Sequence, residues 1–304
     1  MRVLNDRDEK AESQELGFFS IASHSFMCAL GIFTAFFSPL PMIAAHFKLS
    51  DPWPKVVALA GAVLALGFLQ LPLMMVMVLF IFGLFVSDAV WREMGFGKLL
   101  LASAVVALAA GVGTFVVSAE VNQVGLLSHW TDLIDKGVAS LESAQKTLQM
   151  NSAIDWKMLK NELLFEGPFL YLAAMLFSLW VSIGVAAHLG WIPEGHTYSA
   201  ARLRQIRFPG WISVLFGVAF VANVFIADAR VHHVSSGVVH IVGVLMFMQG
   251  CMSLSELMFR KTARSRVRTF VYSLAVLIGF YAVVGIGVIS PWALRKKRIM
   301  EEVI

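Results

Sequence analysis

The chain has 304 residues, of which 58% are hydrophobic and 14% are charged. Soluble proteins carry roughly 25% charged residues, so this composition excludes an ordinary soluble domain. The charges lie in short clusters between long uncharged runs, which is typical of a chain that folds in lipid. The net charge of +4 comes from basic residues beside these runs and predicts cytoplasmic loops, with no nucleic-acid partner. We therefore expect an all-α membrane protein, a polytopic helical bundle whose main partner is the lipid bilayer.

The N-terminal segment and the cysteines exclude two other classes of protein. Residues 1–16 carry five acidic residues against three basic ones, unlike the basic start and short apolar core of a secretory signal. We expect them to remain as a polar tail. Cys28 and Cys251 each lie deep in an apolar run, so a disulfide framework or a zinc site is not expected.

The first membrane half is expected to span residues 17–121 with about four helices. A helix needs about 20 apolar residues to cross the bilayer, and the first such run, residues 17–45, ends in Ser38-Pro39-Leu40-Pro41. The next uncharged run, residues 56–87, is too long for one crossing and is interrupted at Gln70-Leu71-Pro72. Two short helices are predicted there, with one kinked helix as the alternative. The last run covers residues 99–119.

Residues 122–165 differ from the runs on either side. Apolar residues recur there at helical spacing, with charged residues elsewhere on the helical wheel. Ser152, followed by Asp155, resembles a capping box that opens a second helical piece. The pattern predicts one or two amphipathic helices on the bilayer surface or over the bundle. This insert separates residues 17–121 from the second membrane half, residues 166–294.

The second half contains four further apolar runs, which gives eight transmembrane helices as the preferred count, with six and seven as alternatives. These runs are residues 167–189, 209–227, 237–259 and 269–294.

Arginine clusters predict the orientation of the chain in the membrane. Three arginines lie within residues 202–207 and five basic residues within 260–268, whereas Arg230 is the one basic residue between the sixth and seventh runs. The positive-inside rule puts both clusters in the cytoplasm and the amphipathic insert outside. The basic tail, residues 295–304, conflicts with this assignment if the last run crosses the membrane, and we give the larger loop cluster more weight.

The order of these parts resembles a known family. After the Ser38-Pro39-Leu40-Pro41 motif and the amphipathic insert, an Arg-rich loop leads into Phe208-Pro209. Gln249-Gly250 stands within a helix before a basic loop, and residues 287–292 precede the basic tail. This arrangement, from about residue 17 to 298, resembles the YybS-like family of bacterial polytopic membrane proteins. The resemblance implies a multi-pass protein of the bacterial inner membrane.

The YybS-like family is distantly similar to the substrate-binding membrane subunits of energy-coupling-factor transporters. The resemblance therefore implies a transporter-like protein with a small-molecule site inside the bundle. It also implies a membrane or cytoplasmic partner that supplies energy. The alternative is a structural or assembly protein of the cell envelope, which holds other envelope proteins through the amphipathic insert and basic loops.

Polar residues within apolar runs are candidates for the small-molecule site, because polar groups are costly in hydrocarbon. Gln249, Ser253 and Glu256 are spaced by four and three residues, which places them on one helix face where they are expected to line a cavity. The alternative is an interhelical hydrogen bond from Gln249 with Glu256 at the membrane interface. Such bonds average about 0.6 kcal/mol and are common in membrane bundles.

Three further residues complete the predicted substrate-binding set, namely Asn223, Gln70 and His24. Asn223 and Gln70 are expected to face the same cavity as Gln249. Structural hydrogen bonding is the alternative for each of the three, and for Gln70 this includes satisfying the backbone at the Pro72 break.

No metal, cofactor or catalytic centre is expected. Asp228, His232, His233 and His240 suggest a metal site, but adjacent His232 and His233 point in different directions and the spacing of the set is loose. The sequence contains no phosphate-binding glycine loop, nucleophile elbow or His-Glu-x-x-His pattern. We therefore expect a protein that is not an enzyme.

Overall fold

The computed structural model describes residues 18–34, 37–49, 51–147, 154–226, 228–261 and 279–301. The regular elements in these residues are helices. The polar tail at residues 1–16, Ser152, and the arginines at positions 264, 266 and 268 lie outside the described residues.

The first half of the chain forms five helices within the described residues. They are α2 (Phe18–Thr34), α3 (Pro39–Lys48), α4 (Trp53–Gly67), α5 (Leu73–Trp91) and α6 (Phe96–Val121). The rest of the described chain forms α7 (Leu126–Thr147), α8 (Trp156–His188), α9 (Ala200–Leu203), α10 (Gly210–Phe225), α11 (Ala229–Lys261) and α13 (Phe280–Glu301).

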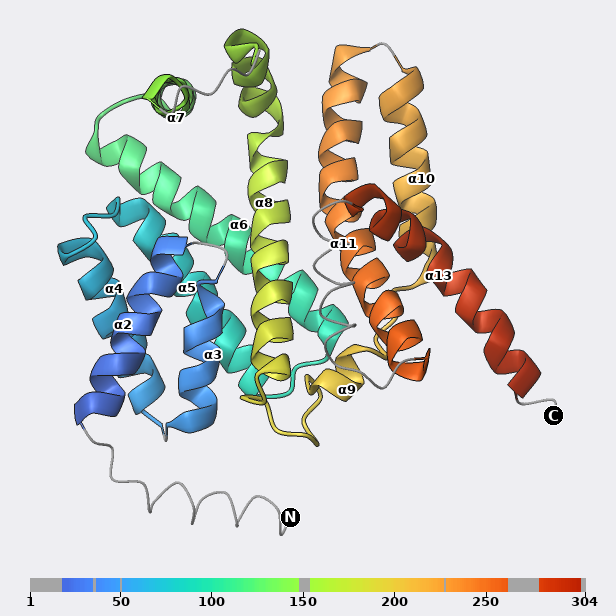
Figure 1. The fold of residues 1–304 in the computed structure, drawn as a ribbon. Coiled ribbons are helices and arrows are strands. Elements are labelled where there is room, and N and C mark those ends of the chain that lie inside the picture. The colour runs from blue at the N-terminus through green and yellow to red at the C-terminus, as the bar shows by residue number, and fades with distance from the viewer. Residues whose placement is uncertain are drawn as a thin grey trace.

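The helix α8 joins two groups of helices (Figure 1). It contacts α3 and α6 in one group and α11 in the other, and α11 in turn contacts α10 and α13. We call the two ends of the bundle the α7 end and the α9 end. The connection between α10 and α11 lies at the α7 end, and α8 and α11 both finish at the α9 end. Because the α9 end carries the arginines of residues 202–207, the positive-inside rule predicts that it is cytoplasmic.

Four helices in the described part of the chain are long and apolar enough to cross a membrane. They are Leu73–Trp91, Phe96–Val121, Trp156–His188 and Arg230–Met258. Four shorter apolar helices accompany them, namely Ser20–Ile32, Trp53–Gly67, Gly210–Phe225 and Tyr281–Pro291. Because these have fewer than 18 residues, the count of eight transmembrane helices stays a prediction.

The first apolar run forms two helices where one was expected. α2 ends at Thr34, and α3 begins at Pro39 with Ser38 as its N-cap residue. Proline is tolerated in the first turn of a helix, because its missing N–H has no intrahelical acceptor there. Pro39 and Pro41 therefore begin α3 instead of ending the preceding helix.

The uncharged run at residues 56–87 forms two helices, as predicted, and not one kinked helix. α4 ends at Gly67 and α5 begins at Leu73. Gln70 lies in the connecting turn with a left-handed φ of 49°, and Pro72 precedes the first residue of α5.

The expected boundary between the amphipathic insert and the second half, after residue 165, falls inside α8. Asp155 is the N-cap of this helix, and its carboxylate accepts hydrogen bonds from the backbone N–H groups of Lys157 and Met158, each at 3.0 Å. α8 then continues through Pro168 without interruption. The second amphipathic piece is thus the first part of a long apolar helix, and α7 alone forms a separate amphipathic element.

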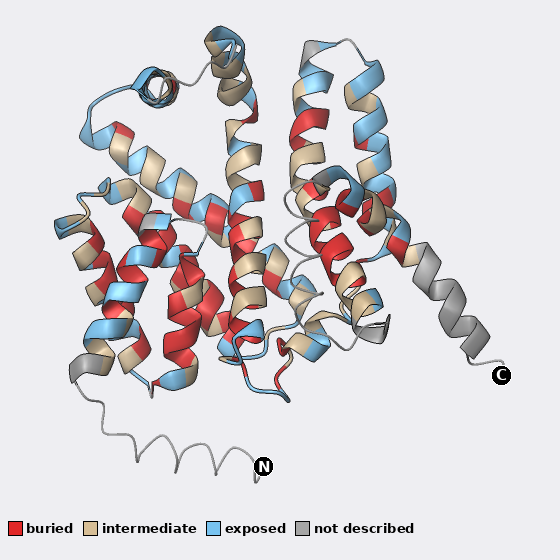
Figure 2. Ribbon diagram, in the orientation of Figure 1, coloured by how far each residue is buried: buried red, intermediate tan, exposed pale blue. Residues whose placement is uncertain are grey.

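Buried residues form two clusters, one centred on α2 to α5 with α8 and the other on α11 with α13. By contrast, α6 and α10 are largely exposed (Figure 2). The exposed positions of α6 include Leu101, Val105 and Val112, and those of α10 include Val214 and Val218. Apolar side chains that face outward over whole helices fit contact with lipid. Cys28 and Cys251 are both buried.

Candidate functional site

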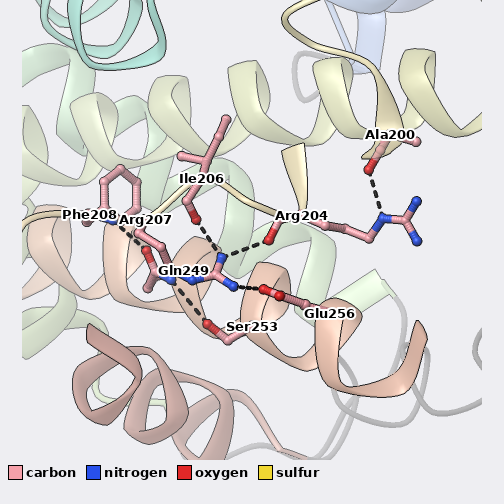
Figure 3. A network of polar contacts seen from close by, with 8 residues as sticks. All are labelled: Ala200, Arg204, Ile206, Arg207, Phe208, Gln249, Ser253 and Glu256. Atoms are coloured by element: carbon pink, nitrogen blue, oxygen red, sulfur yellow. Dashed lines mark hydrogen bonds and ion pairs between the residues drawn. The ribbon is translucent and has the colours of Figure 1, made fainter. Parts of the chain in front are cut away.

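Gln249 on α11 is fully buried and holds the segment between α9 and α10 (Figure 3). Its Oε1 accepts a hydrogen bond from the backbone N–H of Phe208 at 2.7 Å. Its Nε2 donates to Oγ of Ser253 at 3.1 Å, one turn further along α11. The oxygen and the nitrogen of the amide are thus both bonded to protein atoms, one in the segment before α10 and one on α11 itself, so neither bond joins two helices.

Glu256 lies one turn beyond Ser253 and pairs with Arg207, and their side chains are 21% and 25% exposed. Nη1 of Arg207 also donates to the carbonyl oxygens of Arg204 and Ile206, each at 2.7 Å. Gln249, Ser253 and Glu256 do share one helix face, as their spacing predicts. That face is covered by the arginine-rich segment (Figure 3).

Asn223 lies near the end of α10, at the α7 end of the molecule. Its backbone oxygen lies 3.2 Å from Nδ1 of His232, and its Oδ1 accepts from Oγ of Ser235 at 3.5 Å. Gln249 follows Ser235 by fourteen residues on α11, which corresponds to about 20 Å along a helix. The structure therefore does not bring Asn223 and Gln249 to one cavity.

Gln70 and His24 lie in the first group of helices, apart from both of these places. Gln70 is exposed in the turn between α4 and α5. His24 is half-buried on α2, and its Nδ1 lies 2.7 Å from the carbonyl oxygen of Ser20 in the preceding turn. Gln249, Ser253 and Glu256 thus lie together on α11, whereas Asn223, Gln70 and His24 each lie elsewhere in the bundle.

A cavity of about 240 Å³ lies between α8 and α11 near the α7 end. Leu159, Leu163 and Leu170 of α8 provide its apolar lining. Its polar lining consists of Glu162 and Glu166 of α8 with His232, Ser236 and His240 of α11.

Glu166 is the most deeply buried charged residue of this cavity, at 6% exposure. Its Oε2 accepts a hydrogen bond from Oγ of Ser236 at 2.7 Å. Nδ1 of His233 lies 3.4 Å from Oε1, and Nδ1 of His240 lies 3.6 Å from Oε2. The ring of Phe165 stacks on His233 with the ring centroids 4.6 Å apart. A carboxylate is therefore held at the seam of two apolar helices by one short hydrogen bond and two longer imidazole contacts.

Two groups in the cavity are less well satisfied. Nδ1 of His240 is buried and makes no hydrogen bond to the described residues. Glu162 is half-buried, and its carboxylate forms no ion pair or hydrogen bond within the described part of the chain. Lysine and arginine are missing from the cavity lining. The cavity therefore has an acidic lining with unused hydrogen-bonding capacity.

Within the described ranges, no group of three or more His, Cys, Asp or Glu side chains lies close enough together to hold a metal ion. Asp228 instead caps α11, with Oδ1 accepting from the backbone N–H groups of Arg230 and Val231 at 3.0 and 3.1 Å.

Sequence reasoning missed Glu162 and Glu166, which it assigned to the amphipathic insert and the start of the next half. A signal was present, because these two acids are four residues apart and share a face of α8. Ser236 and His240 share a face of α11 by the same spacing. What sequence reasoning lacked was the pairing of α8 with α11.

A family model described as "Predicted membrane protein (DUF2232)" matches residues 18–289. The match extends from the start of α2 into α13 and includes both the cavity and the segment that covers Gln249. No curated protein and no solved structure matches the chain. The apolar helices of the structure agree with the description of the family, and the chain belongs to the DUF2232 family of predicted membrane proteins.

Proposed function

We propose that this chain is a transporter-like membrane protein that binds a small molecule in the cavity between α8 and α11. The observation that carries the proposal is the burial of Glu166 in the lining of that cavity. Ionisable side chains within apolar helices are costly, and they mark the pathways and sites of substrates or ions in membrane proteins. The proposal includes no catalytic step.

The resemblance to the YybS-like family supports the same function. That family is similar to substrate-binding subunits of energy-coupling-factor transporters, which implies a bacterial inner-membrane protein with a partner that supplies energy. The cavity lies towards the α7 end, and the arginines of residues 202–207 lie at the α9 end. With the α9 end in the cytoplasm, as the positive-inside rule predicts, the cavity is accessible from the outer side.

The polar residues predicted from the sequence take different parts in this proposal. Asn223 supports the cavity, because it contacts His232, a lining residue. Gln249, Ser253 and Glu256 hold the arginine-rich segment on α11 and so fix the end of the bundle that faces a cytoplasmic partner.

A second candidate function, a structural or assembly protein of the cell envelope, is favoured by the surface of α7. Leu127 and Leu141 of this helix are 79% and 54% exposed. α7 is attached to α8 through Trp130, whose Nε1 donates to the carbonyl oxygen of Leu164 at 3.0 Å. Exposed leucines on an anchored amphipathic helix fit a membrane surface or another envelope protein.

Native mass spectrometry of the full chain, purified in detergent without added ligand, tests the proposed function. We expect a small molecule to accompany the wild-type protein. Leu163→Trp fills the cavity and is expected to lose that molecule, whereas Leu133→Trp on the exposed side of α7 retains it. Equal retention by the two variants, or no bound small molecule in any sample, overturns the proposal. A co-purifying protein that is lost on Leu127→Ser with Leu141→Ser supports the second candidate.

A further inference from the structure

We propose that the molecule bound between α8 and α11 is a small organic cation, a short amine with a hydroxyl group. This inference deepens the proposed function and rests on it. The cavity lining contains two carboxylates, Glu162 and Glu166, and neither lysine nor arginine. A cation gains Coulomb energy from both carboxylates, and the gain is larger at a partly buried site than in water. An anion is repelled by both.

The carboxylates lie at a spacing that suits a single ammonium group. Glu162 and Glu166 are four residues apart on α8, so they are neighbours on one helix face, with Cβ atoms about 6 Å apart. Within the described residues Glu162 has no ion-pair partner, and the shortest contact of Glu166 is the neutral hydroxyl of Ser236 at 2.7 Å. An ammonium between the two acids supplies charge-assisted hydrogen bonds, which are stronger than neutral ones.

His240 adds a reason to expect a hydroxyl or a further N–H on the ligand. Its Nδ1 is buried without a hydrogen-bond partner, and it lies 3.6 Å from Oε2 of Glu166, which is too far for a hydrogen bond. A buried polar atom without a partner loses free energy that a suitably placed ligand restores.

The volume of the cavity limits the size of the cation. At about 240 Å³, it is smaller than the 300–1,000 Å³ of sites for drug-sized ligands. Leu159, Leu163 and Leu170 line the remaining wall and contact the carbon atoms of a short chain. The described residues hold no group of three or more side chains suited to a metal ion, so the geometry favours an organic cation over a metal.

Thermal unfolding of the purified full chain in detergent tests the charge of the ligand with three two-carbon alcohols. Ethanolamine is cationic at neutral pH, ethylene glycol is neutral and glycolate is anionic. At matched ionic strength, we expect ethanolamine to raise the Tm with a saturable dependence on concentration. Ethylene glycol and glycolate are expected to leave the Tm unchanged.

Glu162→Gln tests the carboxylate without disturbing the deeply buried Glu166. Because Glu162 has no described partner, the variant is expected to keep the wild-type Tm in the absence of probe. The ethanolamine concentration at half-effect is expected to rise tenfold or more, the order of a lost hydrogen bond to a charged group. Glu120→Gln makes the same charge change on an exposed residue of α6 and is expected to respond like wild type.

The inference is overturned if ethanolamine gives no shift, if ethylene glycol or glycolate stabilises as well, or if Glu162→Gln responds like wild type. These outcomes are distinguishable from failure of the proposed function. A neutral or anionic molecule that accompanies wild type and is lost from Leu163→Trp overturns the cationic ligand and leaves the binding function intact.

Discussion

The side-chain oxygen of Gln249 lies 2.7 Å from the backbone nitrogen of Phe208, forty-one positions earlier in the chain. This hydrogen bond ties the segment before α10 to the middle of α11. The same helix contributes Ser236 and His240 to the cavity near its other end. α11 therefore links a cavity at the α7 end with an arginine-rich segment at the α9 end, and it does so through one continuous helix.

Replacing Gln249 by leucine is expected to loosen the arginine-rich segment. The backbone N–H of Phe208 is then buried without an acceptor, which costs about 1–3 kcal/mol. The segment opens more often, so limited trypsin digestion is expected to cleave faster after Arg204 and Arg207. Gln70→Leu, in an exposed turn, serves as the control and is expected to leave the cleavage rate unchanged. Equal cleavage of the Gln249 variant and wild type contradicts the tethering role.

Ser236→Ala is expected to lower the Tm of the protein. It removes the 2.7 Å hydrogen bond to Glu166 and leaves a buried carboxylate with only the two longer imidazole contacts. Hydrogen bonds to charged groups contribute about 1.5–3 kcal/mol. Ser140→Ala on the exposed face of α7 is the matched control, because the hydroxyl of Ser140 bonds only within its own helix turn. An unchanged Tm in the Ser236 variant shows that Glu166 does not depend on this bond.

The burial of Tyr198 leads us to expect a loss of stability at alkaline pH. Its side chain is fully buried in the connection between α8 and α9, and its hydroxyl donates to the carbonyl oxygen of Met94. Burial raises the pKa of Tyr198 above its ordinary value, which is near 10. Above that pH the unfolded chain releases this proton and the folded protein keeps it, so stability falls as pH rises towards the pKa of the folded state.

The pH dependence of the Tm, compared between wild type and Tyr198→Phe, measures this loss of stability. We expect the Tm of the variant to fall less steeply than that of wild type between about pH 10 and 11, because the variant has no phenol to ionise at this position. The comparison cancels other groups that titrate in the same range. Identical slopes for the two proteins contradict the burial argument.

Hydropathy located several helices from the sequence. A long uncharged run in lipid must satisfy its own backbone hydrogen bonds, and a helix is the structure that does so. Hydropathy divided residues 56–87 at the Gln70 turn, since the run exceeds one crossing and carries an internal proline. The prolines after Ser38 were interpreted as the end of the first helix, whereas they begin α3. Proline occurs both just after a helix and in the first turn of the next one, so its position in the sequence does not distinguish the two. The choice between these depends on packing of α3 against α5 and α8, which the sequence does not contain.

The predicted polar site depends even more on tertiary contacts that the sequence does not contain. Spacing by four and three placed Gln249, Ser253 and Glu256 on one face, because helical periodicity is local. The partner that covers this face is Phe208 with its neighbours, which is a tertiary contact. Asn223 was grouped with Gln249 because hydropathy does not show how deep in the membrane each side chain lies. Glu166 was missed because its role depends on the contact between α8 and α11.

The close approach of α11 and α13 depends on glycine at position 287. A Cβ added there would lie 1.8 Å from the backbone oxygen of Met246 and 3.1 Å from the backbone nitrogen of Gly250. Backbone atoms of a packed helix cannot move aside singly, so Gly287→Ala must separate the two helices. Overpacking of this kind typically costs 1–3 kcal/mol, and we expect a clearly lower Tm.

Gly285, on the same helix, provides the matched control for this prediction. A Cβ added at Gly285 meets no atom within 4 Å, and alanine has a higher helix propensity than glycine. Gly285→Ala is therefore expected to keep or slightly raise the Tm. If Gly287→Ala and Gly285→Ala unfold at the same temperature, the contact between α11 and α13 is not as close as described. The two variants have the same composition and differ only in the position of the added methyl group. A lower Tm for Gly287→Ala than for Gly285→Ala therefore shows that α13 packs closely against the backbone of α11 at Met246.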